Sequence, residues 1–196
     1  PAAAPQDMKT LVAIVAFAAA SLGAERLVEG APSSTVRVVI YEDLQCPDCA
    51  VFRTMLDTQI LPKYASKAAF EHRDFPLPKH KWARRAAIAA RYFETVNAKT
   101  AIEWRRYCFG HLKEIDADNF NAKLADWAKA HGADPAKAAA ALDDKALAAL
   151  VEDDYQDAIA RGIAHTPTVL VNDEPFIETF TFEEIARGLE KAISGK

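Results

Sequence analysis

The chain has 196 residues, of which 51% are apolar, and its formal net charge is -4 at pH 7. This length and composition fit one compact domain or a core domain with an insertion, and they exclude a disordered or fibrous chain. The slightly acidic balance offers no cationic face for phosphates, which excludes nucleic acid as a partner.

Residues 1–26 form a leader-like or docked N-terminal segment, for which two interpretations stay open. Met8 and Lys9 precede an uncharged, alanine-rich run from Leu11 to Ala24, which is typical of a secretory signal. The same run fits an amphipathic helix docked on the protein. With 14 residues, it is too short to span a bilayer comfortably.

Residues 27–80 carry a β-α-β pattern. The β-branched run Val36 to Tyr41 predicts a buried strand, and Cys46-Pro47-Asp48-Cys49 follows within five residues. Ala50 to Leu61 predicts a helix that ends before Pro62. Ala69 to Phe75 predicts a second strand. The cysteine pair is therefore expected at a junction between a strand and a helix.

Residues 81–162 show helical periodicity and no strand signal. One apolar stripe is predicted on Trp82, Ala86, Ala89, Phe93 and Val96. Asp134 before Pro135, and later Asp143 or Asp144, are expected to begin further helices. The acidic cluster Glu152 to Asp154 is interpreted as solvated surface, and Cys108 as a buried thiol.

Residues 163–196 predict a β-β-α ending. Thr168 to Asn172 and Pro175 to Ile177 fit a hairpin that turns at Asp173 and Glu174. A final helix follows, because Thr181 and Glu184 have the spacing of a capping box.

The cysteine pair predicts redox chemistry. Unpaired N–H groups at a helix start stabilise a thiolate, so Cys46 is the expected nucleophile and Cys49, one turn further, resolves the mixed disulfide. Pro47 fits the first helical turn without loss of a needed donor. A zinc site normally requires four ligands, and here Cys108 and the five histidines lack ligand spacing. No metal is therefore expected, and a purely structural disulfide would close too short a loop to stabilise the fold much.

Thr166-Pro167 stands directly before the strand that begins at Thr168. Bonds that precede proline are the only ones with an appreciable cis population, and a proline is tolerated best at the first residue of a strand. A plain trans proline is the open alternative.

These features together resemble the DsbA-like branch of the thioredoxin superfamily. The runs that carry the resemblance are Glu42-Asp43-Leu44-Gln45-Cys46-Pro47-Asp48-Cys49, Phe75-Pro76-Leu77 with His80, and Gly162-Ile163-Ala164-His165-Thr166-Pro167-Thr168. The resemblance spans about Leu27 to Ile193. It implies an α/β, thioredoxin-like fold with a helical insertion between the β-α-β and β-β-α halves. It also implies that Pro167 is cis and faces the disulfide, and that Thr166 and Pro167 bind extended substrate backbone.

Three residues depart from the family pattern. Ile40 stands where many relatives have a buried carboxylate, and Glu42, on the same strand face, is a possible proton relay; a surface glutamate is the favoured alternative. Asp48 replaces the histidine of strongly oxidising relatives, which predicts a weaker thiolate and a milder oxidant. His165 replaces a glycine and opposes this effect if it lies near Cys46.

The resemblance implies an oxidoreductase that passes its disulfide to reduced or misoxidised protein substrates. It also implies reoxidation by a membrane quinone-linked partner, no cofactor, and a periplasmic or otherwise extracytoplasmic location. Two alternatives stay open. One is a disulfide reductase or isomerase, and the other is a non-catalytic thioredoxin-fold module that binds peptides or metal. The oligomeric state has no signal in the sequence.

Overall fold

The structure is a computed structural model that describes residues 26–195, so the predicted leader-like or docked run lies outside the described residues. Within this range, no helix combines the length and the apolar character needed to cross a bilayer. The strands are β1 (Val28–Gly30), β2 (Arg37–Glu42), β3 (Ala69–Asp74), β4 (Thr168–Val171) and β5 (Glu174–Ile177). The helices are α1 (Pro47–Met55), α2 (Leu61–Tyr64), α3 (Ala83–Val96), α4 (Ala98–Gly110), α5 (Phe120–Ala130), α6 (Pro135–Ala141), α7 (Lys145–Ala160) and α8 (Phe182–Ser194).

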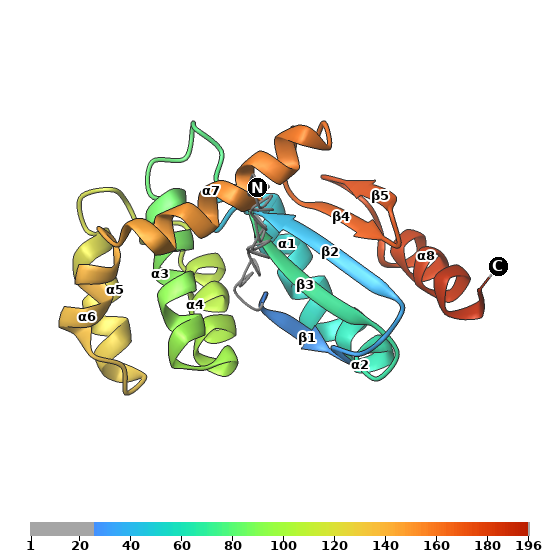
Figure 1. Ribbon diagram of the computed structural model, residues 1–196, viewed down its shortest axis with the longest axis horizontal. Coiled ribbons are helices and arrows are strands. Elements are labelled where there is room, and N and C mark those ends of the chain that lie inside the picture. Colours follow the sequence, from blue (N-terminus) through green and yellow to red (C-terminus); the bar gives the residue numbers. More distant parts are fainter. Residues whose placement is uncertain (1–25, 196) are drawn as a thin grey trace, which may run out of the picture.

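The five strands form one sheet in the order β1-β3-β2-β4-β5 (Figure 1). β2 and β3 are parallel, as a β-α-β unit requires, and the other neighbours are antiparallel. β2 is the central strand, and its Val38 and Ile40 are fully buried. This burial agrees with the apolar, β-branched character of the run. Both the β-α-β and the β-β-α predictions are confirmed, whereas β1 has no counterpart in them.

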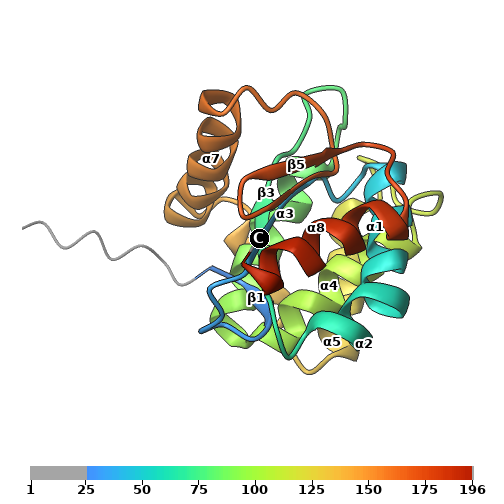
Figure 2. The ribbon, with the colours of Figure 1, turned by 90° about the vertical axis from the view of Figure 1, so that its right-hand side faces the viewer.

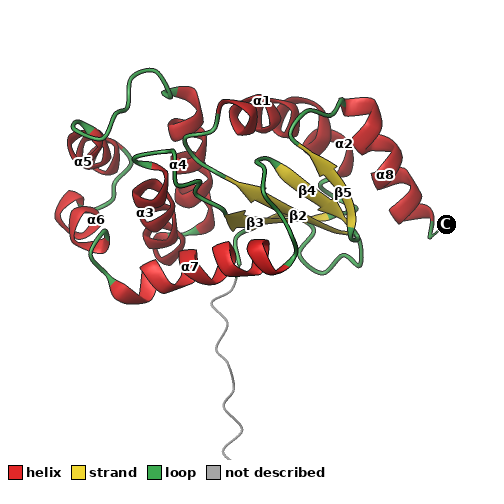
Figure 3. Ribbon diagram, turned by 90° about the horizontal axis from the view of Figure 1, so that it is seen from above, coloured by secondary structure: helices red, strands yellow, loops and turns green. Residues whose placement is uncertain are grey.

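Helices cover both faces of the sheet. α1, α2 and α8 lie on one face and α7 runs along the other (Figure 2). α3 to α6 form a helical block beyond one side of the sheet (Figure 3). Between the sheet, α1 and α8 lies a core of aliphatic and aromatic side chains that includes Ile40, Phe52, Val169 and Ile185.

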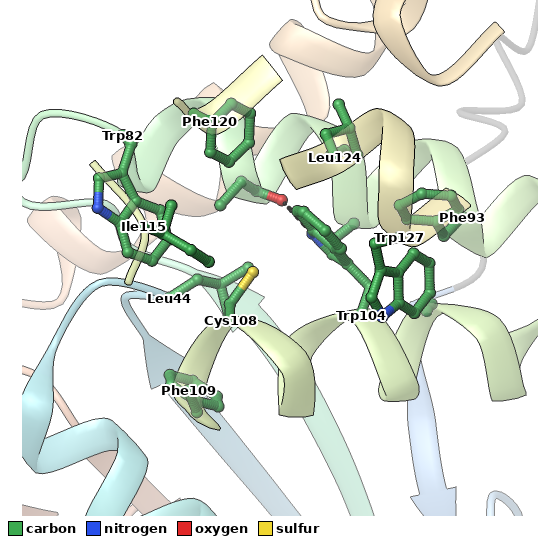
Figure 4. Packing of buried hydrophobic residues seen from close by; sticks show 14 of the residues in the cluster. Leu44, Trp82, Phe93, Trp104, Cys108, Phe109, Ile115, Phe120, Leu124 and Trp127 are labelled. Carbon is green, nitrogen blue, oxygen red and sulfur yellow. Dashed lines mark hydrogen bonds between the residues drawn. The ribbon is translucent and has the colours of Figure 1, made fainter. Parts of the chain in front are cut away.

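A second, aromatic core fills the helical block and reaches the cysteine pair. Trp82, Phe93, Trp104 and Trp127 are all fully or nearly fully buried in this block (Figure 4). Cys108 lies among them with no exposed surface, which confirms the prediction of a buried thiol. Cys46 and Cys49 belong to the same cluster, so the helical block packs directly against the two sulfur-bearing residues.

The helix after the cysteine pair continues further than predicted. After α1, the chain forms a π-helical segment (Leu56–Ile60) and then α2, with Pro62 in the first turn of α2. Proline is tolerated in a first turn because no backbone donor is needed there. The widened turn before it lets the helical path continue, so Pro62 does not end the helix.

The predicted caps are confirmed at Asp134, Asp144 and Thr181, whose side chains accept hydrogen bonds from backbone N–H groups. The hairpin turn was misplaced by one residue. Asn172 and Asp173 have positive φ values of 43° and 71° and form the turn, a conformation that asparagine and aspartate tolerate better than most residues.

Two predictions for side chains of the helical block are wrong. Asp154 is fully buried rather than solvated, because it pairs with Arg91 and accepts a hydrogen bond from the Asp74 N–H at 3.0 Å. Val96, placed on the apolar stripe, is 45% exposed. It is the last residue of α3.

Candidate active site

The cysteine pair lies where β2 passes into α1. Cys46 is the N-cap residue of α1 in an extended conformation, and Pro47 occupies the first turn, as expected. Cys46 is 5% exposed and Cys49 is fully buried, and both are free thiols. Only the first sulfur is therefore positioned to meet another molecule without movement of the chain.

The two thiols have opposite pKa shifts. The pKa of Cys46 is lowered to about 6, because the Cys49 thiol donates a hydrogen bond to its sulfur. The N–H groups of Cys49 and Asp48 at the helix start add to this, and together these donors outweigh burial. The pKa of Cys49 is raised well above its ordinary value by burial, by Cys46 and by the charge of Glu42. One group is thus a ready thiolate and the other a protected thiol.

Residues of the β4 entry face Cys46. The Thr166–Pro167 bond is cis, and the Thr166 carbonyl oxygen lies 3.3 Å from the Cys46 sulfur, within reach of the protonated thiol as a donor. A surface cavity of about 410 Å³ opens in front of the sulfur. Its lining consists of Cys46, Asp48, Leu77, Pro78, Lys79, Ala164, His165, Thr166 and Glu178.

The structure brings the two tuning residues of the sequence prediction to the rim of this cavity. His165 is exposed, and its Nδ1 lies 2.9 Å from Glu178 Oε1, so a carboxylate offsets any charge on the ring. Asp48 is exposed as well, and its backbone N–H contributes to the lowered pKa of Cys46. Their opposing effects on the redox strength stay predictions.

Glu42 is not the surface glutamate that the sequence favoured; it is 2% exposed. Its carboxylate lies 2.8 Å from His72 Nδ1 and accepts a hydrogen bond from Arg105 Nη1 at 3.0 Å. Burial opposes its charge, but His72 and then Arg105 hold the pKa of Glu42 below its usual range. The carboxylate therefore stays ionised beside the cysteine pair and helps to keep Cys49 protonated.

The sequence did not predict the burial and pairing of two groups of charged residues around the pair, although Glu42, Asp43 and His80 lie in the runs that carry the family resemblance. One is a buried ion network that consists of Glu29, Glu42, His72, Asp74, Arg91, Arg105 and Asp154. The other is Asp43, which is 1% exposed and pairs with His80.

A metal centre has no counterpart in the described part of the chain. Within residues 26–195, no three histidine, cysteine, aspartate or glutamate side chains converge in a way that would hold a metal ion. The arrangement at the cavity instead offers one reactive sulfur, one protected sulfur and an extended backbone segment beside them.

Comparison with known proteins gives a consistent result. A family model described as thioredoxin matches residues 24–191, whereas no curated protein matches the chain. Oxidised BdbD from Bacillus subtilis is 25% identical, with a TM-score of 0.76 and coverage of 87% of this chain and 94% of BdbD. Alpha-DsbA1 from Wolbachia pipientis is 19% identical, with a TM-score of 0.74 and coverage of 88% and 92%. ScsC from Proteus mirabilis is 17% identical, with a TM-score of 0.71 and coverage of 87% and 74%.

Proposed function

Because the chain belongs to the thioredoxin family, we propose that it is a thiol-disulfide oxidoreductase that exchanges a Cys46–Cys49 disulfide with cysteines of protein substrates. The predicted α/β thioredoxin-like fold and the likeness to DsbA-type proteins are confirmed. The observation that carries the proposal is the opposite shift of two neighbouring thiols, with the pKa of Cys46 lowered to about 6 and that of Cys49 raised.

In the proposed oxidative direction, a substrate thiolate attacks Cys46 of the disulfide. A bond forms between the two sulfurs, and Cys49 leaves and takes up a proton. A second substrate thiolate then attacks the substrate sulfur of this mixed disulfide, and Cys46 leaves as a thiolate. A thiol with a low pKa is the better leaving group, so the lowered pKa of Cys46 supports donation of the disulfide to the substrate.

Substrate binding is assigned to the loop opposite the pair. An extended peptide that pairs with the backbone at Thr166 and Pro167 would present its cysteine to the Cys46 sulfur. The short distance between that sulfur and the Thr166 carbonyl oxygen, 3.3 Å, supports this assignment. The cavity in front of the sulfur offers room for the neighbouring substrate side chain.

The cellular setting is part of the proposal. An oxidised dithiol persists outside the reducing cytosol, so we assign the activity to the periplasm or another extracytoplasmic compartment. A membrane quinone-linked protein would restore the disulfide there. Disulfide reduction or isomerisation is the second candidate, and the exposed carboxylate of Asp48, close to Cys46, favours it because it disfavours the thiolate.

The test is an oxidative folding assay with a reduced, unfolded model protein, together with the equilibrium potential against glutathione. Cys46→Ser is expected to abolish oxidation, whereas Cys108→Ala, which changes a thiol buried in the helical block, is expected to retain it. Full activity of Cys46→Ser would overturn catalysis by this pair. A potential near that of thioredoxin, about -270 mV, would overturn the oxidative direction and favour the reductase.

A further inference from the structure

Asp43 contacts both cysteines through its backbone. Its N–H donates to the Cys49 sulfur at 3.5 Å, and its carbonyl oxygen accepts from the Cys46 N–H at 2.9 Å. The residue is 1% exposed. The position of Asp43 therefore fixes the start of α1 and also places a backbone N–H against the Cys49 sulfur.

The side chain of Asp43 joins this backbone to the opposite wall of the cavity. Oδ1 accepts from the Gln45 N–H at 2.7 Å, and Oδ2 accepts from the Leu77 N–H at 2.7 Å. Oδ2 also lies 2.7 Å from His80 Nδ1. Leu77 is part of the cavity lining in front of Cys46. One buried carboxylate thus serves three donors on two different loops.

His80 is the member of this group that reaches the surface, with 15% of its side chain exposed. Its backbone N–H donates to the Leu77 carbonyl oxygen at 2.9 Å, which closes the loop on which it lies. Charge-assisted hydrogen bonds of this kind are stronger than neutral ones, and an unpaired buried carboxylate is costly. The pair therefore holds the two loops in one relative position.

We propose that Asp43 and His80 are positioning residues for the step in which the bond between the Cys46 and Cys49 sulfurs breaks or forms. In the oxidative direction this is the departure of Cys49, and in reverse it is the resolution of the mixed disulfide by Cys49. This inference rests on the function proposed above. In the resolving direction Cys49 gives its thiol proton to solvent and forms a bond with the Cys46 sulfur, while the bond between Cys46 and the outgoing group breaks and that group departs as a thiolate. The Asp43 N–H donates to the Cys49 sulfur as negative charge develops on it, and the carboxylate and His80 keep that N–H aimed.

The experiment follows the reaction of the reduced full chain with excess dithiobis(nitrobenzoate) by stopped flow. Cys46 attacks the reagent, keeps one thionitrobenzoate as a mixed disulfide and releases the other. Cys49 then attacks the Cys46 sulfur and releases the second. The two increases in absorbance report Cys46 and Cys49 separately. Cys108 is fully buried, so we expect it to react only after unfolding.

His80→Ala is expected to slow the second phase by about tenfold and to change the first by less than about threefold. His80→Asn places an amide donor near the position of Nδ1 and is expected to restore the second phase to within about threefold of the wild type. Asp43→Asn has one acceptor oxygen for three donors and is expected to slow the same phase. The double variant should be no slower than either single one, because both changes break one unit.

His131→Ala is the matched control. Its ring stacks on Trp127 in the helical block, away from the cavity, so both phases should stay unchanged. If His80→Ala does not fold, His80→Gln replaces it, because its amide lies near Nε2 and cannot replace the Nδ1 donor. The second phase of His80→Gln is then compared with that of His80→Asn. Equal second phases in these variants and the wild type would overturn the positioning role. If only Cys46→Ser loses both phases, the proposed function is still supported although the positioning role is not. Two unaltered phases in Cys46→Ser would overturn the proposed function itself.

Discussion

At the scale of single residues, the reactivity of Cys46 depends on donors that point at its sulfur rather than on a charged neighbour. The largest contribution to its lowered pKa is the hydrogen bond from Cys49. The backbone N–H groups of Cys49 and Asp48 at the helix start contribute further. The contribution of the Cys49 side chain can be removed by substitution, so a titration can test it.

Cys49→Ala is expected to raise the pKa of Cys46 above the wild-type value of about 6, because the strongest donor to the thiolate is lost. Thiolate absorbance as a function of pH measures this shift directly. Cys108→Ala removes a thiol that does not contact the pair and should leave the titration midpoint unchanged. An unchanged midpoint in Cys49→Ala would contradict the assignment of that donor.

Asp48→Asn is expected to lower the pKa of Cys46 and to make the protein a stronger oxidant, because a negative charge near the thiolate is removed. Asp48 is exposed, so water screens it and the shift should stay below about one pH unit. The thiolate titration and the potential against glutathione should move together. Asp153→Asn removes an equally exposed carboxylate from α7 and serves as the control; if both variants behave alike, Asp48 has no specific effect.

The sequence was sufficient for residues whose role depends on local context. Cys46, Cys49 and Pro167 could be identified because a spacing, a helix start and a strand start lie within a few positions of them. The burial of Glu42, Asp43 and Asp154 could not be predicted, since the burial of a charged residue depends on partners far along the chain. Glu42 is buried because Arg105, 63 positions away, supplies a matching charge.

At the scale of elements, a histidine of β3 that lies between carboxylates of β1 and β2 links these three neighbouring strands. Both ring nitrogens of His72 in β3 face carboxylate oxygens, with Nδ1 2.8 Å from Glu42 in β2 and Nε2 2.9 Å from Glu29 in β1. Burial opposes the charge of the ring, but Glu42 and Glu29 raise the pKa of His72 above its ordinary value of 6.5. The contact of the His72 imidazolium with Glu29 thus holds the short strand β1 to the sheet, in addition to the backbone pairing of β1 with β3.

This ion triad makes stability depend on pH. The unfolded chain releases the His72 proton near pH 6.5, whereas the folded chain keeps it to higher pH. The free energy of unfolding should therefore decrease above about pH 6.5, by up to about 1.4 kcal/mol per pH unit, until the folded pKa is passed. The stabilisation is fully present below that range, as long as the pKa values of Glu29 and Glu42, which are lowered, keep both carboxylates ionised.

Urea unfolding across this pH range tests the prediction. His72→Gln cannot titrate and should lose the extra slope, whereas His131→Gln, which changes an exposed ring, should keep it. A wild-type curve that is flat above about pH 6.5 would contradict a charged His72 in the folded state.

The elements themselves were predictable where periodicity and capping agree, as in α6, α7 and α8, whose N-cap residues were all identified. The path through Pro62 was not, because a π-helical turn is set by packing and not by propensity. β1 escaped notice for a similar reason. It is three residues long, and its place in the sheet depends on pairing with β3 and on the contacts of Glu29 with His72 and Arg53.

At the scale of the whole molecule, the ion network joins the sheet to the helical block. Arg105 of α4 contacts Glu42 of β2 at 3.0 Å and Asp74 of β3 at 2.9 Å. Arg91 of α3 contacts Asp74 at 2.7 Å and also pairs with Asp154 of α7. We propose that residues 81–162 are an insertion in the thioredoxin-like unit, with 27–80 and 163–196 as its two halves, and that these ion pairs couple the parts.

Coupling of this kind predicts one cooperative unfolding transition. The three tryptophans lie in the helical block, so their fluorescence reports that part, and far-ultraviolet circular dichroism reports the whole. The two urea transitions should coincide in the wild type. Arg105→Met should lower the free energy of unfolding by about 3 to 5 kcal/mol, because buried carboxylates lose their partner.

Arg84→Met is the matched control for this experiment. Arg84 and Glu152 form an ion pair whose side chains are 45% and 44% exposed, so its loss should change stability by less than about 1 kcal/mol. Equal effects of the two substitutions, or separate transitions in the wild type, would contradict the coupling.

The outer strand β5 has a consequence for the behaviour of the protein at high concentration. An unpaired strand edge is a template on which other copies can add strands and aggregate. β5 forms that edge with only four residues, and Pro175, which has no N–H, lies within it. Glu174 adds a negative charge at the start of the strand. A short, charged and proline-interrupted edge resists strand addition between copies, so this edge needs no helix from residues 26–195 to protect it.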